Sequence, residues 1–253
     1  MSEPVVPDSE TAVSGYLERL LDLIELVSTG PSTRSFRQMA RLLGAPPTTV
    51  HRLLTLLIDR GYCRRTADGA FEAGPRLLGI GAQAAERPEI VAAARAVDEL
   101  AEITGESASC AILVDDRIVL VARRSSPQAH PPAPLVGAVL APHVSALGKA
   151  ILAGTAAERR RQVLERFVPG CADAILGSLG NELSEVERSG HAIDEETFRP
   201  GLRCRAVSAG NPASGTLGGI SLSGPLSRFT TSRADSVIPM LRQLAGAVVG
   251  QAC

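Results

Sequence analysis

The chain has 253 residues, 45% of them hydrophobic, which suffices for one or two domains with a real core. No apolar run reaches the roughly 18 residues that a membrane span requires. The five cysteines are widely spaced without a Cys-x-x-Cys pair, which argues against a disulfide framework or a zinc site. We therefore expect a globular protein with no membrane association and no cofactor. Its acidic, proline-containing N-terminus is unlike a signal peptide, which predicts a cytoplasmic location.

Residues 1–13 show no hydrophobic periodicity, and we predict a disordered tail there. From Ser14 to about Ser28, leucine and isoleucine recur at helical spacing before the stop signal Thr29-Gly30-Pro31. This pattern predicts the supporting helix of a first domain that spans residues 14–75.

Two further helices are predicted next. Ser35 followed by Gln38 is a capping-box start, and Gly44 is a typical helix end. A second helix is expected from Pro47 to about Arg60, because proline is tolerated in a first turn and the residues that follow form one apolar and one polar stripe.

Beyond this helix the sequence predicts a hairpin. Residues 62–65 and 70–73 flank Asp68-Gly69, a pair that favours a tight turn. Helix, turn, helix and hairpin form the layout of a winged helix-turn-helix. Residues 31–76 contain eight arginines and three carboxylates, a local net charge of +5 (8 − 3) in a chain whose net charge is −1. Positive charge is thus concentrated where DNA phosphates would be met.

The second helix of such a unit enters the major groove with its N-terminal residues facing base edges. The chain contains 3% aromatic residues and no Trp, which favours duplex DNA over a stacking surface for single strands. A helix-turn-helix also occurs in domains that bind no nucleic acid, and an arginine-rich face can be merely solvated. The predicted DNA contacts are Thr48, Thr49, His51 and Arg52 with bases, Arg34 and Ser35 with phosphates, and Arg64 and Arg65 on the wing.

Residues 76–87 are rich in small side chains and are interpreted as a linker helix, and a domain of different composition follows at 88–253. Helices that alternate irregularly with antiparallel-looking strands predict an α+β, GAF-like domain around a central antiparallel sheet. The predicted helices are 89–104, 145–153, 156–167, 183–189 and 229–249, and the predicted strands are 107–114, 117–123, 135–140, 191–194, 204–210 and 216–223.

Separated motifs in this second domain add a more specific signal. They read VSALGKAILA at 144–153, GHAIDEE at 190–196, PGLRCRA at 200–206 and GISLSGP at 219–225. Together with the winged helix, their order and spacing resemble the IclR family of bacterial transcription regulators. One departure is that residues 206–212, AVSAGNP, displace the proline of the family's Ala-x-Pro-Val.

The resemblance implies a C-terminal effector-binding domain and dimers or dimers of dimers on pseudo-palindromic operators. It also implies a binding site for a small carboxylate, formed by the amides of Ala146 and Leu147 and the side chains of Asp194, Cys204, Ser221 and Ser223.

The chemistry of this set suits an anion, because a helix N-terminus offers unpaired N–H groups and partial positive charge. Ser221 and Ser223 are two apart on a strand and would share one face. The two serines could instead form a polar outer face, Asp194 could be surface charge, and Cys204 could fill space in the core. Lys149, the sole lysine, is interpreted as structural, tied to a carbonyl or a carboxylate.

The sequence thus predicts a transcription regulator, a repressor rather than an activator, controlled by a small hydroxy or keto acid. Only five Phe and two Tyr are available to stack on an aromatic acid, although the family also senses such acids. Two alternatives are a C-terminal domain that only oligomerises and an enzyme that uses Ser221, His143 and Asp194, or Cys204. No Gly-x-Ser-x-Gly elbow supports the enzyme.

Overall fold

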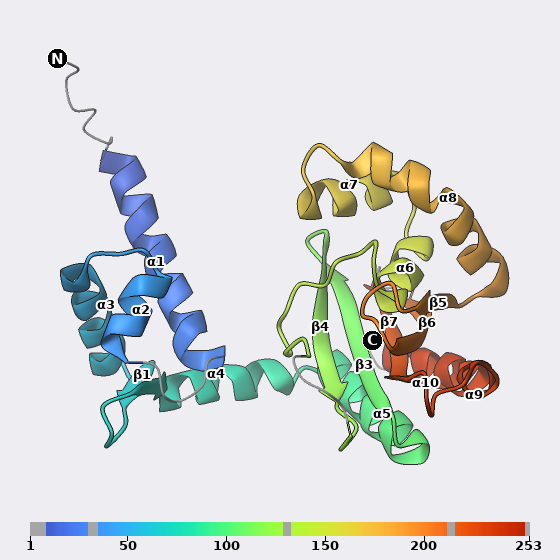
Figure 1. Cartoon of the computed structure of the whole chain (residues 1–253), viewed down its shortest axis with the longest axis horizontal. Helices are drawn as coiled ribbons and strands as arrows, with labels where there is room; N and C mark the ends of the chain where they lie inside the picture. Colours follow the sequence, from blue (N-terminus) through green and yellow to red (C-terminus); the bar gives the residue numbers. More distant parts are fainter. Residues whose placement is uncertain (1–8, 30–34, 129–132, 212–215, 251–253) are drawn as a thin grey trace. The chain divides into compact units, whose positions relative to one another are not determined.

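The computed structural model describes residues 9–29, 35–128, 133–211 and 216–250. The chain divides into two compact units, one ending at Ala85 and the other beginning at Glu86 (Figure 1). Within the described ranges, no helix is both long enough and apolar enough to cross a membrane.

The first unit is a winged helix-turn-helix, as predicted. The tail prediction is wrong for residues 9–13, which are helical because good helix formers such as Glu10 and Ala12 precede the apolar stripe. Residues 1–8 lie outside the described ranges. The elements are α1 (Ser9–Thr29), α2 (Phe36–Leu42), α3 (Pro47–Asp59), β1 (Cys63–Arg65), β2 (Phe71–Ala73) and α4 (Pro75–Ala85).

One side chain from each of the first three helices forms the centre of this unit. Leu23, Met39 and Leu53 are completely buried, and Phe71 of the hairpin packs into the same cluster. The predicted start of α2 is supported by the Ser35 N–H, which donates to the Gln38 side chain at 2.8 Å. Because the apolar stripe of α3 packs inward, its polar stripe is left on the surface.

The second unit is built on a five-stranded sheet in the order β4-β3-β7-β6-β5, with every neighbouring pair antiparallel. This confirms the predicted α+β class. The elements are α5 (Pro88–Thr104), β3 (Ser107–Val114), β4 (Arg117–Arg124), α6 (Ala146–Ala153), α7 (Ala157–Phe167), α8 (Ala172–Ser189), β5 (Ala192–Glu195), β6 (Leu202–Asn211), β7 (Thr216–Pro225), α9 (Thr231–Ser236) and α10 (Ile238–Gly250).

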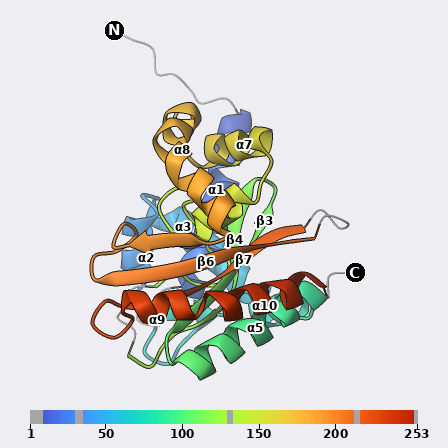
Figure 2. The same cartoon turned by 90° about the vertical axis from the view of Figure 1, so that its right-hand side faces the viewer.

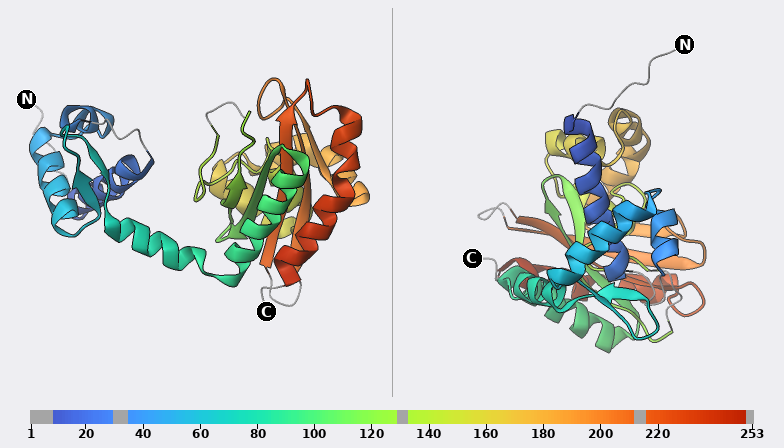
Figure 3. Two further views of the ribbon diagram at one scale, coloured as in Figure 1. Left: turned by 90° about the horizontal axis from the view of Figure 1, so that it is seen from below. Right: turned by 90° about the vertical axis from the view of Figure 1, so that its left-hand side faces the viewer.

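Helices cover both faces of this sheet. Helices α5 and α10 pack side by side on one face, and α6 and α8 lie on the other (Figures 2 and 3). Strand β3 shows the alternation, because Ala108 and Cys110 join the α5 and α10 core whereas Ala111 and Leu113 join the α6 and α8 core. Ser107 and Ser109 share the face of Ala111 but lie beyond the cover of α6, where a cavity opens.

Three element predictions are wrong. Residues 135–140 form no regular strand, although backbone hydrogen bonds join them to β4 around the isolated bridge Val119–Val139. Helix α8 begins at Ala172 and not at 183, because burial of Leu179 outweighs the helix-weakening effect of two glycines. The predicted helix 229–249 is two helices, α9 and α10, since Pro239 has no N–H to continue a single helix.

Gly148 in α6 is a position where only glycine fits. A Cβ there would lie 2.5 Å from the Pro142 carbonyl oxygen and 2.8 Å from that of Ala141. Gly148→Ala should therefore lower the free energy of unfolding by about 1 to 3 kcal/mol in urea titrations. Gly177→Ala is the matched control, because nothing lies within 4 Å of its Cβ position in α8. That substitution should raise stability by about 0.5 to 1 kcal/mol. Equal effects of the two substitutions would contradict this account.

Candidate functional site

The predicted base-contacting residues lie on the first two turns of α3. Thr48, His51 and Arg52 are exposed, and Thr49 is partly exposed. The His51 ring also packs edge-on against Phe36 of α2, with ring centroids 6.2 Å apart. His51 therefore connects the two helices in addition to presenting polar atoms at the surface.

The predicted wing arginines both have partners within the hairpin. Arg64 forms an ion pair with Glu72, which lies directly opposite it in the strand register. The Arg65 guanidinium lies 5.9 Å from the centre of the Phe71 ring. An exposed ion pair is worth only about 0 to 1 kcal/mol, so this pairing leaves Arg64 able to meet a phosphate. Ser35 is exposed, and Arg34 lies outside the described residues.

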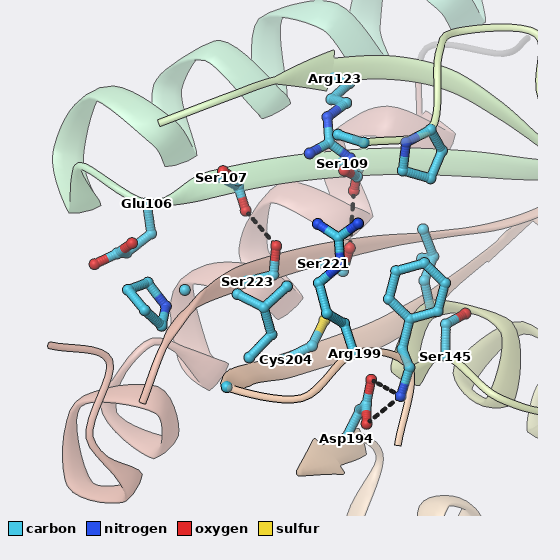
Figure 4. Close-up of a pocket in the computed structure, with 18 of the residues that line it drawn as sticks. Glu106, Ser107, Ser109, Arg123, Ser145, Asp194, Arg199, Cys204, Ser221 and Ser223 are labelled. Atoms are coloured by element: carbon cyan, nitrogen blue, oxygen red, sulfur yellow. Dashed lines mark hydrogen bonds between the residues drawn. The ribbon is translucent and has the colours of Figure 1, made fainter. Parts of the chain in front are cut away.

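The second unit contains a cavity of about 290 Å³. Figure 4 shows it above the face formed by β3, β7 and β6, and Ser145 at the start of α6 lies on its wall. Five of the six predicted effector-site residues line it, namely Leu147, Asp194, Cys204, Ser221 and Ser223. Ala146 is not among the lining residues, and its side chain is completely buried in the α6 and α8 core.

The start of α6 has the geometry expected of an anion-binding helix end. The Ser145 hydroxyl accepts from the Gly148 N–H at 3.1 Å. The first N–H groups of a helix have no intrahelical acceptor. Among the described residues, no backbone carbonyl accepts from the N–H groups of Ala146 and Leu147. Buried Lys149 has the structural role expected of it, because its Nζ lies 2.6 Å from a Glu182 carboxylate oxygen and ties α6 to α8.

Four serines form two cross-strand pairs on the cavity floor. Ser107 lies opposite Ser223 and Ser109 lies opposite Ser221 in the register of β3 and β7. The Ser223 and Ser221 hydroxyls donate to the carbonyls of their partners over 3.4 and 3.5 Å, which are long and therefore weak hydrogen bonds. The hydroxyls face the cavity and not an outer surface (Figure 4).

Asp194 is buried, so its interpretation as surface charge is wrong. Its Oδ1 accepts from the backbone N–H of Thr197 at 2.8 Å and of Phe198 at 3.2 Å. The carboxylate thus fixes the turn that follows β5. Burial, and next the charge of Asp194, raise the pKa of the neighbouring Cys204 thiol to about 12, so the thiol is neutral.

Two arginines are among the cavity residues that the sequence analysis did not identify, Arg123 at the end of β4 and Arg199 in the turn after β5. Burial, and next the charge of Arg199, lower the pKa of the Arg123 guanidinium. At the cavity rim, Arg228 instead pairs with buried Glu106 at 2.8 Å. The cavity therefore contains more positive charge than the amides and hydroxyls alone would supply.

A helix-turn-helix with an exposed second helix, joined to a domain with a ligand-sized cavity, defines a ligand-responsive DNA-binding regulator. The model of the IclR helix-turn-helix domain matches residues 16–67, and that of the bacterial transcriptional regulator IclR C-terminal domain matches residues 82–249. The chain belongs to the IclR family.

Two relatives of this family can be aligned with the chain over most of their own length. The chain is 30% identical over 243 residues to the HTH-type transcriptional regulator BhcR of Paracoccus denitrificans, covering 90% of this chain and 85% of the relative. It is 27% identical to the transcriptional repressor IclR of Escherichia coli, covering 90% and 86%. These relatives are regulators and not enzymes, and this protein is likewise a transcription regulator.

Solved structures share the fold. An IclR homolog from Microbacterium hydrocarbonoxydans, complexed with 4-hydroxybenzoate, matches with a TM-score of 0.76 at 19% identity and covers 94% of this chain and 98% of that one. The IclR protein of Thermotoga maritima matches with a TM-score of 0.72, also at 19% identity, and covers 94% and 99%.

Arg52→Ala should weaken binding to the preferred duplex by about 1 to 3 kcal/mol and relax selectivity at the base pairs that Arg52 contacts. The control is Arg60→Ala, which removes the same charge at the other end of α3. Selection from a random duplex library followed by titration measures both effects. An unchanged sequence profile for Arg52→Ala would show that this arginine contacts no base.

Cys204 should alkylate far more slowly than exposed Cys171 in the native protein. A pKa of about 12 leaves roughly one thiol in ten thousand as thiolate at pH 8, and thiolate is the reactive form. Residue-resolved mass spectrometry after iodoacetamide treatment measures both rates, and labelling in urea provides the unprotected reference. Similar native rates at the two positions would show that the Cys204 thiol is not suppressed.

Proposed function

We propose that this IclR-family regulator is a repressor that binds a pseudo-palindromic operator as a homodimer or homotetramer, under the control of a small carboxylate effector. The observation that carries the effector assignment is the cavity of the second unit, which Ser145 and Leu147 at the start of α6 line. Helix N-termini favour anions without requiring a basic side chain.

The remaining cavity groups support a carboxylic acid with further polar substituents. The hydroxyls of Ser221 and Ser223 make only long hydrogen bonds to the backbone carbonyls opposite them and can bind a hydroxyl or keto oxygen of the ligand. A hydroxy or keto acid is thus the first candidate class. An aromatic acid is the second, favoured by the Phe198 ring on the cavity wall.

For the DNA-binding unit, we propose that the first two turns of α3 read bases through Thr48, Thr49, His51 and Arg52. Their exposure beside a buried apolar stripe supports this assignment. Ser35 and the two wing arginines, Arg64 and Arg65, would meet phosphates, as would Arg34 from outside the described residues. A regulator of bacterial genes acts on DNA in the cytoplasm.

The test combines unfolding and operator binding. An effector at about 100 times its Kd adds about 2.7 kcal/mol of stability, so a panel of hydroxy, keto and aromatic acids should reveal one that raises the Tm. The same acid should change operator affinity by about 5- to 150-fold. Ser221→Ala should weaken both responses, whereas Ser178→Ala on the exposed surface of α8 should leave them intact. Sequence-specific DNA binding that no acid alters would contradict the effector assignment.

A further inference from the structure

We propose that the effector is a dicarboxylic acid, with one carboxylate at the start of α6 and the other bound by Arg123 and Arg199. This inference rests on the proposed function, because it identifies the chemical class of the effector for the same cavity. It adds a second anion-binding end that neither the motifs nor the helix terminus indicates.

A β-bulge turns Arg123 into the cavity. Along β4, Leu120 lies opposite Ala111 and Ala122 lies opposite Cys110, so Val121 is an extra residue between two consecutive partners. The pairing then resumes with Arg123 opposite the cavity residue Ser109. Bulges of this kind redirect side chains near binding sites. Without the extra residue, strict alternation from Leu120 would place Arg123 on the α5 face.

The next residue confirms this change of face. Arg124 lies on the side of α5, where it forms an ion pair with Asp98 of that helix at 3.2 Å. Arg123 has no such partner, since no carboxylate lies within ion-pair distance of it among the described residues. Its Nε donates to the Ser125 hydroxyl at 3.3 Å. Two adjacent arginines thus have different environments, one neutralised by the protein and one directed into the cavity.

Arg199 brings a second positive charge close to Arg123. The two guanidinium groups repel each other, and this repulsion adds to the effect of burial in lowering the pKa of Arg123. Figure 4 shows both side chains above the strands that carry Ser109 and Ser221. A carboxylate bound between them would accept hydrogen bonds from planar guanidinium donors and relieve the repulsion.

Asp194 acts here through Arg199. Its carboxylate accepts from two backbone N–H groups of the turn that carries Arg199. A third contact closes the turn, because the Glu196 side chain accepts from the Gly201 N–H at 2.8 Å. Asp194 is therefore a positioning residue for this arginine. Loss of its carboxylate should weaken the second carboxylate site without removing the α6 site.

The two anion-binding ends lie apart, with Ser145 and Arg123 well separated in Figure 4. Between them the lining is largely apolar and includes Leu120, Leu140 and Pro134. Such a wall suits a hydrocarbon or aromatic body that connects the two acidic groups.

The experiment compares each dicarboxylic acid with its own monomethyl ester by calorimetric titration of the full-length protein. The probes are succinic, glutaric, adipic and pimelic acids and the benzenedicarboxylic acids. At least one acid should bind about 10- to 100-fold more tightly than its ester, because a charge-assisted hydrogen-bonded contact is lost on esterification.

Variants locate the second site. Arg123→Gln should reduce the preference for acid over ester to about one, and Arg199→Gln should reduce it partly. Arg124→Gln removes the same charge from the opposite face of β4 and should leave the preference unchanged. Arg123→Lys keeps the positive charge and should retain part of the preference for acid over ester. This variant separates the effect of charge from that of packing.

The proposal is overturned if wild-type protein binds acid and ester equally, if no dicarboxylic acid binds, or if Arg123→Gln and Arg124→Gln behave alike. A monocarboxylate that still controls operator binding would then show that the proposed function stands without the dicarboxylate class. Operator binding that no carboxylate alters would contradict both.

Discussion

The pairing of β3 with its two neighbours is the constraint on which the effector domain depends. With β7, the register is unbroken and places Ser107 and Ser109 opposite Ser223 and Ser221, so four hydroxyls share one face. The intervening residues, such as Ala108, pack into the core of α5 and α10. With β4, the register shifts at Val121, and this shift decides which of two adjacent arginines faces the cavity. A one-residue change in pairing would exchange polar and apolar faces, so burial of the α5 side fixes both registers.

The cavity is closed by segments that lie outside regular structure, and this bears on how a ligand changes the protein. Residues 133–141 reach β4 only through the backbone hydrogen bonds around the Val119–Val139 bridge, and the turn after β5 is fixed by Asp194 and Glu196. The opposite wall is rigid by comparison, because α6 is buried and bound to α8 through Lys149. A ligand that contacts both walls would fix residues 133–141 and the turn after β5 relative to α6. Effector control requires that the ligand bind one conformation of the protein more tightly than another.

Much of this architecture could be predicted from the sequence because periodicity and turn chemistry are local. The capping box at Ser35, the hairpin turn at Asp68-Gly69 and the alternation of β7 each lie within a few residues. Arg123 could not be found in this way, because a bulge depends on the partner strand and leaves no local pattern. Asp194 was assigned to the cavity through family resemblance, but its bonds to the following turn required coordinates. The first half of α8 could not be predicted locally, because its two glycines weaken a helix, whereas burial of Leu179 against other elements keeps it helical.

The distribution of charge separates the two functions of the molecule. In the winged helix-turn-helix unit, arginines lie on an exposed surface, where ion pairs such as Arg64 with Glu72 are weak and exchangeable for phosphate. In the effector domain, most arginines are held by carboxylates, and even the completely buried Arg205 pairs with Glu195 and Asp235. Half-buried Arg123 differs from these arginines because it faces the cavity. Desolvation disfavours its charge, and no carboxylate lies at ion-pair distance from it within the described residues. An anionic ligand in the cavity would therefore neutralise this charge.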